Sequence, residues 1–182
     1  MTHLKNLILS VSSQNLKTFF IKKIVSNYKY WMGGIITSEI RNNGRREGYE
    51  IRTLKGAKSV LASVKIISDI SFNKYAVNLD SLEVSSLKAI MTAIEEKKIV
   101  LIDEVGSIAL LSDEFINQVR GALSSQMPVL LIIRAGAKTF LNTLSSMSET
   151  EIYNMEKRNY SEIEKKADAW FEFWINRINR DG

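Results

Sequence analysis

The chain has 182 residues, of which 45% are hydrophobic and 25% charged, and its formal net charge is +5. This length and composition predict a single globular domain over residues 1–182. Without cysteine the chain can form no disulfide or thiolate metal site, and one histidine, His3, cannot form a histidine metal cluster. No apolar stretch reaches the length of a signal peptide or a membrane span, so we expect a cytoplasmic protein without membrane contact.

The first half of the chain predicts a strand–helix unit and then an antiparallel hairpin. Asn6–Val11 is a run of branched apolar residues, typical of a buried strand. Polar residues 12–15 predict a turn, and helical spacing of apolar residues over 16–28 predicts a helix. Residues 42–44, Asn-Asn-Gly, predict a hairpin turn because these residues tolerate positive φ. The segment 59–67 could extend the same antiparallel ribbon.

Helices and strands are predicted to alternate in the second half. Helices are expected at 81–98, at 113–125 with Ser112 or Asp113 as cap, at 137–147 and at about 161–179; strands are expected at 99–106, 129–133 and 151–155. Apolar strands alternating with helices indicate a parallel sheet covered on both faces. We therefore predict an α/β fold of the P-loop NTPase type, with a mainly parallel sheet flanked by helices and an added antiparallel hairpin.

Two acids end the most apolar of these strands. In the run IVLIDEVG, four apolar residues precede Asp103 and Glu104, which predicts two carboxylates at the carboxyl edge of the sheet, where ligands bind in open α/β folds. In P-loop enzymes this is the Walker B element, whose first acid holds Mg²⁺ and whose second can orient the attacking water. Alternatively, the acids cap the following segment.

The segment Val11–Thr18 lies where a phosphate-binding loop, GxxxxGK[ST], would follow the first strand. Lys17 and Thr18 are in register with that pattern, but Val11 and Leu16 replace its two glycines. A P-loop directs successive backbone N–H groups at phosphate, and each non-glycine residue at positive φ costs about 1–3 kcal/mol. Leu16 would also project into the phosphate site, so the two replacements predict a loss of about 3–4 kcal/mol of binding, or two to three decades of affinity.

Four further patterns carry a resemblance to a known family. They are, in chain order, Gly33–Gly34 followed by Thr37, Glu39 and Arg41; Gly44, Arg46, Gly48 and Tyr49; Asn73, Lys74, Tyr75, Val77 and Asn78; and Asp103, Glu104, Val105 and Gly106. In this order and spacing they resemble the small nucleoside-triphosphatase family first recognised in hyperthermophiles, whose human member is called cancer-related nucleoside-triphosphatase. The resemblance covers nearly the whole chain and is strongest in its middle two-thirds.

The chain also departs from the family pattern at positions expected near the ligand. Besides the two missing glycines, Ser107 to Ala109 replace the family's Lys-Met-Glu, and Arg134 stands where the family commonly has histidine. The family's Asn-Arg pair near the nucleotide base becomes Asn159 followed by Tyr160. Ligand-facing positions have changed together while fold-defining ones remain, which favours a protein that kept the structure and lost catalysis.

The resemblance implies a nucleotide site with assigned roles. The expected nucleotide-binding residues are Ser12, Ser13, Gln14, Asn15, Leu16, Lys17, Thr18, Arg46, Arg134 and Asn159. Mg²⁺ would lie between Thr18 and Asp103. The catalytic residues would be Lys17, which holds the β- and γ-phosphates, and Glu104, which orients water. Arg134, at the end of a strand, could clamp phosphate through a bidentate guanidinium.

Three hypotheses for function follow from the sequence. The leading one is a nucleotide-binding or regulatory protein of this family with weak or absent hydrolysis. The second is an active Mg²⁺-dependent hydrolase that converts ATP or GTP to the diphosphate and phosphate, because Lys17, Thr18, Asp103 and Glu104 are all present. The third is nucleic-acid binding, which rests on the net charge alone, since the basic residues are scattered and form no run.

The last predicted helix is unusually aromatic. Trp170, Phe173 and Trp174 extend an apolar face that would pack against the sheet. Because they make that face wider than one contact stripe needs, the surplus could also form a homodimer or protein-partner contact.

Overall fold

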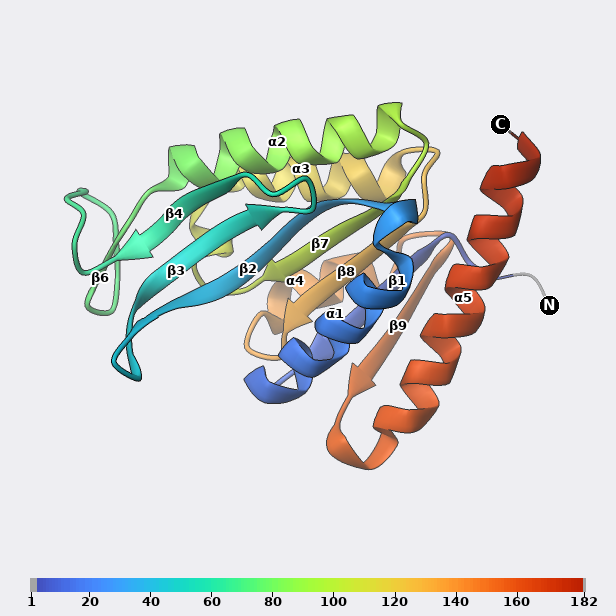
Figure 1. The fold of residues 1–182 in the computed structure, drawn as a ribbon, viewed down its shortest axis with the longest axis horizontal. Helices are drawn as coiled ribbons and strands as arrows, with labels where there is room; N and C mark the ends of the chain where they lie inside the picture. The colour runs from blue at the N-terminus through green and yellow to red at the C-terminus, as the bar shows by residue number, and fades with distance from the viewer. Residues whose placement is uncertain (1–2, 182) are drawn as a thin grey trace.

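The computed structural model describes residues 3–181, and a nine-stranded sheet forms its centre (Figure 1). The strands are β1 (Asn6–Val11), β2 (Met32–Asn42), β3 (Arg45–Thr53), β4 (Lys58–Ser63), β5 (Ser71–Phe72), β6 (Tyr75–Val77), β7 (Ile99–Val105), β8 (Val129–Arg134) and β9 (Thr150–Met155). Their order across the sheet is β5-β6-β4-β3-β2-β7-β8-β1-β9. The five strands from β2 to β9 in this order are parallel, and the other four extend the β2 side as an antiparallel ribbon.

Helices cover both faces of the sheet. They are α1 (Gln14–Tyr28), α2 (Leu79–Glu95), α3 (Asp113–Ser124), α4 (Lys138–Leu144) and α5 (Tyr160–Asp181). One core lies under α2, α3 and α4, and a second lies under α1 and α5 (Figure 1). Along β7, Val100 and Ile102 enter the first core while Ile99 and Leu101 enter the second, which explains why this strand is apolar throughout. The predicted fold class is confirmed.

The antiparallel ribbon begins at the predicted turn. Asn43 and Gly44 have φ of 47° and 78°, the left-handed values that let a tight turn connect β2 to β3. β4 then pairs with β3, as predicted for the segment around it. The sequence did not predict β5 and β6, because strands of two and three residues leave no periodic pattern.

The paired glycines of the family pattern lie where the sheet and a helix approach closely. A Cβ on Gly33 would lie 2.6 Å from the Cβ of Ala93 on α2. Gly34 has a φ of +117°, and a Cβ there would lie 2.1 Å from the carbonyl oxygen of Leu101 on β7. These glycines therefore allow β2 to pack closely against β7 and α2.

The aromatic residues of α5 are used inside the chain. Trp170 and Phe171 are fully buried, and Tyr28 of α1 stacks on Phe171 with ring centroids 4.3 Å apart. The indole nitrogens of Trp170 and Trp174 both donate to the carbonyl of Leu4. The face predicted as a surplus partner surface is thus largely covered by the chain itself. No helix within residues 3–181 combines the length and apolarity needed to span a membrane.

Candidate functional site

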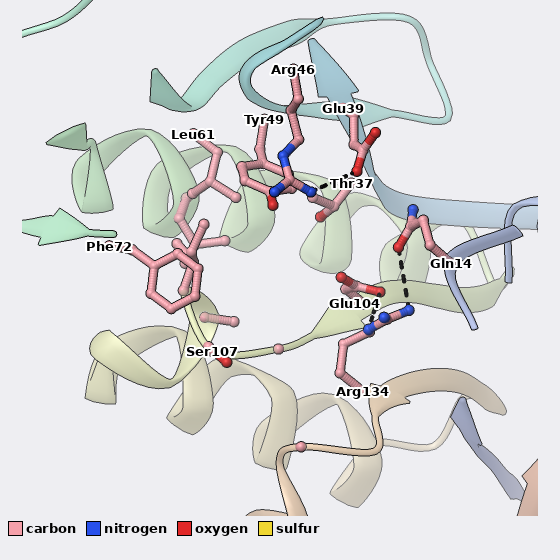
Figure 2. Close-up of a pocket in the computed structure, with 15 residues that line it drawn as sticks. Gln14, Thr37, Glu39, Arg46, Tyr49, Leu61, Phe72, Glu104, Ser107 and Arg134 are labelled. Atoms are coloured by element: carbon pink, nitrogen blue, oxygen red, sulfur yellow. Dashed lines mark hydrogen bonds and ion pairs between the residues drawn. The ribbon is translucent and has the colours of Figure 1, made fainter. Parts of the chain in front are cut away.

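The carboxyl ends of β1, β2, β7 and β8 lie at one edge of the sheet, where residues of β2, β7 and β8 border a pocket of about 350 Å³. Arg46 and Glu39 border it on the side of the antiparallel ribbon, and Glu104 and Arg134 border it on the opposite side (Figure 2). Gln14, at the start of α1, closes one end. Ligands bind at this edge in open α/β sheets, so it is the candidate site.

The predicted phosphate loop is mostly helix. Only Ser12 and Ser13 connect β1 to α1, which begins at Gln14. The Ser13 side chain accepts a hydrogen bond from the backbone N–H of Leu16 at 3.3 Å, and its carbonyl accepts one from the N–H of Lys17 at 3.0 Å. Serine is a strong N-cap, so the helix starts before a loop can form, and it includes Gln14, Asn15 and Leu16. The backbone N–H groups of Leu16 and Lys17 are therefore bonded within the helix and do not point into a phosphate site.

The two residues that replace the glycines pack in the core below. Val11 is fully buried at the end of β1, and its carbonyl accepts a hydrogen bond from the N–H of Ala135. Leu16 is half-buried against the same core cluster under α1 and α5. Within residues 11–18, all described by the structure, no residue has a positive φ. The strain expected for Val11 in a P-loop is therefore absent, because the segment does not have that conformation.

Lys17 points down into the carboxyl edge instead of into the pocket. Its side chain is 2% exposed, and its Nζ lies 2.8 Å from Asp103 Oδ1 and 3.2 Å from Glu104 Oε2. The ammonium also donates to the carbonyl of Thr37 on β2 at 3.3 Å. Burial alone would lower the pKa of Lys17, but the two carboxylates more than offset it and raise the pKa. Lys17 is thus a buried cation held by both predicted Walker B acids.

A bulge at the end of β7 brings those two acids to the same place. Asp103 pairs with Ile132 of β8 and Val105 with Ile133, so Glu104 is the extra residue. A bulge re-aims side chains that would otherwise alternate between faces. Asp103 is buried beneath the pocket, whereas Glu104 remains partly exposed and borders it. Burial raises the pKa of Asp103 to about 7, and Lys17 offsets this only in part.

These residues do not fit a magnesium ion. The Lys17 ammonium already lies against the Asp103 carboxylate, where it would repel a second cation. Thr18, the other predicted ligand, is half-buried on α1 and does not border the pocket. Among residues 3–181, no group of three or more histidine, aspartate or glutamate side chains could hold a metal. We therefore assign no step to Mg²⁺.

The raised pKa of Asp103 predicts a pH dependence of stability. In the unfolded chain an aspartate titrates near pH 3.9, so between about pH 4 and pH 7 the folded chain binds the extra proton. Stability contributed by this proton should fall as pH rises through that window. We expect the free energy of unfolding, measured with urea, to be lower at pH 8 than at pH 5, and Asp103→Asn to flatten the difference. An equal change in the free energy of unfolding between pH 5 and pH 8 in the native chain and in Asp103→Asn would contradict the assignment.

Arg134, predicted as a phosphate clamp, ties three elements together. It extends from the end of β8, and its Nη2 donates to the carbonyl of Ser12 at 2.8 Å. Its Nη1 donates to the Gln14 side chain at 3.2 Å, and its Nε lies 3.9 Å from Glu104 Oε2. The guanidinium thus borders the pocket while holding the β1–α1 link in place.

Arg46 borders the opposite side of the pocket and is also paired. Its Nη1 donates to Glu39 Oε1 at 3.0 Å, and its Nε donates to the Tyr75 hydroxyl at 3.1 Å. The guanidinium lies over the Tyr49 ring, 5.2 Å from the centroid. Partial burial would raise the pKa of Glu39, but hydrogen bonds from Arg46 and Arg41 lower it, so this carboxylate is charged at neutral pH.

Asn159, predicted near the nucleotide base, caps the start of the last helical segment. Its Oδ1 accepts from the backbone N–H of Glu156 at 2.8 Å, and its Nδ2 donates to the carbonyl of Asn154 at 2.9 Å. It does not border the pocket. The structure therefore brings Gln14, Arg46, Glu104 and Arg134 together and leaves Asn159 apart.

Comparisons with known proteins agree on one family. A family model described as NTPase matches residues 6–167. Nucleoside-triphosphatase THEP1 of Thermococcus kodakarensis is 33% identical over 150 residues, which cover 79% of this chain and 82% of the relative. The same-named protein of Thermotoga petrophila is 31% identical over 164 residues, which cover 90% of this chain and 88% of the relative. The chain belongs to this NTPase family.

Solved structures with the same fold support the architecture of this NTPase-family chain. The crystal structure of THEP1 from Aquifex aeolicus superposes with a TM-score of 0.79 at 22% identity, covering 92% of this chain and 99% of that one. The solution structure of a human cancer-related nucleoside triphosphatase superposes with a TM-score of 0.73 at 22% identity, covering 93% and 96%. The predicted resemblance is confirmed.

One wall of the pocket in this NTPase-family protein could not be predicted from the sequence. It is apolar and is formed by Leu61 of β4, Phe72 of β5, Leu82 of α2, and Ile108 and Ala109 after β7. These residues come from separate elements, so no local pattern joins them. The only signal was indirect: Ala109 stands where the family pattern has glutamate.

Proposed function

We propose that this NTPase-family chain is a binding or regulatory protein that does not hydrolyse nucleoside triphosphates. One observation carries the proposal: the segment between β1 and Lys17 forms the capped start of α1 where a phosphate loop would be needed. In addition, Lys17 is committed to Asp103 and Glu104, so no cation of this segment faces the pocket. Anion binding at a helix start uses free amides, and two of those in the first turn of α1, the N–H groups of Leu16 and Lys17, are bonded to Ser13.

Active hydrolysis of ATP or GTP is the second candidate, because Lys17, Thr18, Asp103 and Glu104 are retained. It would require the first turn of α1 to unwind and the buried ion pairs of Lys17 to separate before phosphate could bind. Both changes oppose binding, and they add to the absence of glycine. Nucleic-acid binding gains no support from the site, since Arg41 and Arg46 are both paired with Glu39.

A thermal-shift experiment tests the proposal directly. A ligand present at one hundred times its Kd stabilises a protein by about 2.7 kcal/mol, so Mg²⁺ with ATP or GTP at millimolar concentration should raise the Tm of a nucleotide-binding relative. We expect no such shift for this chain. The Thermotoga petrophila relative, run in the same buffer, is the positive control.

Phosphate release supplies the second readout. We expect the native chain and Glu104→Gln to release phosphate from ATP at the same background rate. Release by the native chain that Glu104→Gln abolishes would overturn the proposal, because Glu104 is the acid that would orient water in a hydrolase.

A further inference from the structure

The pocket at the carboxyl edge has two unlike ends. Its polar end holds two guanidinium groups and two carboxylates, Arg46 with Glu39 on one side and Arg134 with Glu104 on the other (Figure 2). These four lining charges sum to zero, and the buried pair Lys17 and Asp103 behind Glu104 lies outside the lining and combines one basic with one acidic group. The other end is walled by the hydrocarbon side chains Leu61, Phe72, Leu82 and Ile108. A matching ligand is therefore neutral overall, with charges at one end and hydrocarbon at the other.

This distribution disfavours nucleotides as the occupant. A polyphosphate would face the carboxylates of Glu39 and Glu104, and the hydrogen bonds from Arg41 and Arg46 keep the first of these charged. A nucleobase placed at the other end would bury its polar edges against Leu61, Leu82 and Ile108, which offer no hydrogen-bond partner. Burying polar groups without partners is costly.

The polar end has a hydrogen-bond donor and a hydrogen-bond acceptor that are not used by other residues of the described chain. Arg46 uses its Nε and Nη1, and within residues 3–181 its Nη2 makes no hydrogen bond. Glu104 shares its Oε2 between Lys17 and Arg134, whereas its Oε1 receives no hydrogen bond from the described chain. Gly106 keeps the space beside that oxygen open, since a Cβ there would lie 3.5 Å from Oε1 and 3.1 Å from Arg134 Cγ. A donor and an acceptor on one ligand could both be satisfied.

We propose that this pocket binds a small zwitterion with a hydrocarbon side chain, namely a free α-amino acid with a large apolar side chain. The carboxylate would pair with Arg46, the ammonium with Glu104, and the side chain would enter the apolar end beside Phe72 and Leu82. A volume of about 350 Å³ suits a ligand of this size. The inference rests on the proposed function, because it treats the site as a binding site and not as the active site of a hydrolase.

Isothermal titration calorimetry with four probes tests the ligand class. We expect L-phenylalanine to bind, and we expect at least about tenfold weaker binding of 3-phenylpropionate, which lacks the ammonium, and of 2-phenylethylamine, which lacks the carboxylate. L-Serine, which keeps both charges but lacks the apolar side chain, should also lose at least about tenfold. Equal affinity for L-phenylalanine and either single-charge analogue, or no binding of L-phenylalanine at millimolar concentration, would overturn the inference.

Two variants locate the site, and a third is a matched control. Ser107 is exposed at the pocket rim, so Ser107→Phe should fill the pocket and abolish binding without disturbing the core. Phe72→Ala should weaken binding about tenfold by removing an apolar wall. Ile67→Ala, in the loop between β4 and β5, is fully exposed and outside the pocket, so it should leave binding unchanged. Undiminished binding by Ser107→Phe would place the ligand elsewhere and overturn the assignment.

The two proposals can fail separately. The amino-acid titrations contain no nucleotide, so absence of L-phenylalanine binding leaves the non-hydrolysing assignment intact. Conversely, phosphate release that depends on Glu104 would refute the proposed function whether or not L-phenylalanine binds.

Discussion

Replacing Lys17 by methionine is expected to lower the free energy of unfolding by about 3–5 kcal/mol, the usual cost of removing one partner of a buried ion pair. The substitution keeps helix propensity and side-chain length, but it leaves the buried Asp103 carboxylate beside Glu104 with no ammonium. The loss should be greater at pH 8 than at pH 5, because protonation of Asp103 relieves the unpaired charge. Urea denaturation at the two pH values measures both effects.

Lys22→Met is the control for that experiment. Lys22 lies on the same helix but is exposed, and exposed substitutions usually change stability by less than about 0.5 kcal/mol. In the double variant Lys17→Met with Asp103→Asn, part of the loss should be recovered, since the buried charge is gone. If Lys17→Met proves as stable as Lys22→Met, Lys17 does not form the ion pairs described above.

Gly34→Ala is expected to destabilise the fold by about 4 kcal/mol. A non-glycine residue held at a φ of +117° adds about 1–3 kcal/mol of strain. The new Cβ would also lie 2.1 Å from the Leu101 carbonyl oxygen, and displacing packed backbone adds about 1–3 kcal/mol. Because Leu101 belongs to β7, whose end carries the two acids, we expect the change to disturb the site together with the sheet.

Gly44→Ala separates the two contributions to that loss. Gly44 also has a positive φ, 78°, but a Cβ there meets no atom within 4 Å. We therefore expect a cost of only about 1–3 kcal/mol, from backbone strain alone. Chemical denaturation of both variants gives the comparison, and equal losses would show that contact with Leu101 is unimportant.

The elements that were predictable carry their signals locally. Asn43 and Gly44 specify the hairpin turn through positive φ, and Ser112 caps α3 by accepting from the N–H of Phe115 at 2.9 Å. The apolar run before Asp103 predicts a parallel strand that is buried on both faces. Because both acids come at the end of this strand, they were expected at the carboxyl edge of the sheet. These features depend on a few neighbouring residues, so one sequence suffices to find them.

The features that were not predictable depend on residues distant in sequence or on competing local preferences. Lys17 and Asp103 are 86 positions apart, and no pattern around either shows that they pair. The segment from Val11 to Thr18 matches a phosphate loop in register, but Ser13 is also a strong helix cap, and in the structure the helix forms. The apolar wall of the pocket likewise joins residues from four parts of the chain.

The packing of Val11 and Leu16 against the core also limits how such a protein could evolve. A lineage that regained glycine at either position would first lose side-chain packing in the core under α1 and α5. Neither glycine alone would free Lys17 from its two carboxylates. The loss of core packing would therefore come before any catalytic benefit. Under the proposed function, a chain with only one of the two glycines would therefore be less stable without gaining hydrolysis. For the non-hydrolysing protein proposed above, Val11 and Leu16 thus link the packing of the core to the absence of a phosphate loop, so a single substitution at either position would change stability before it changed activity.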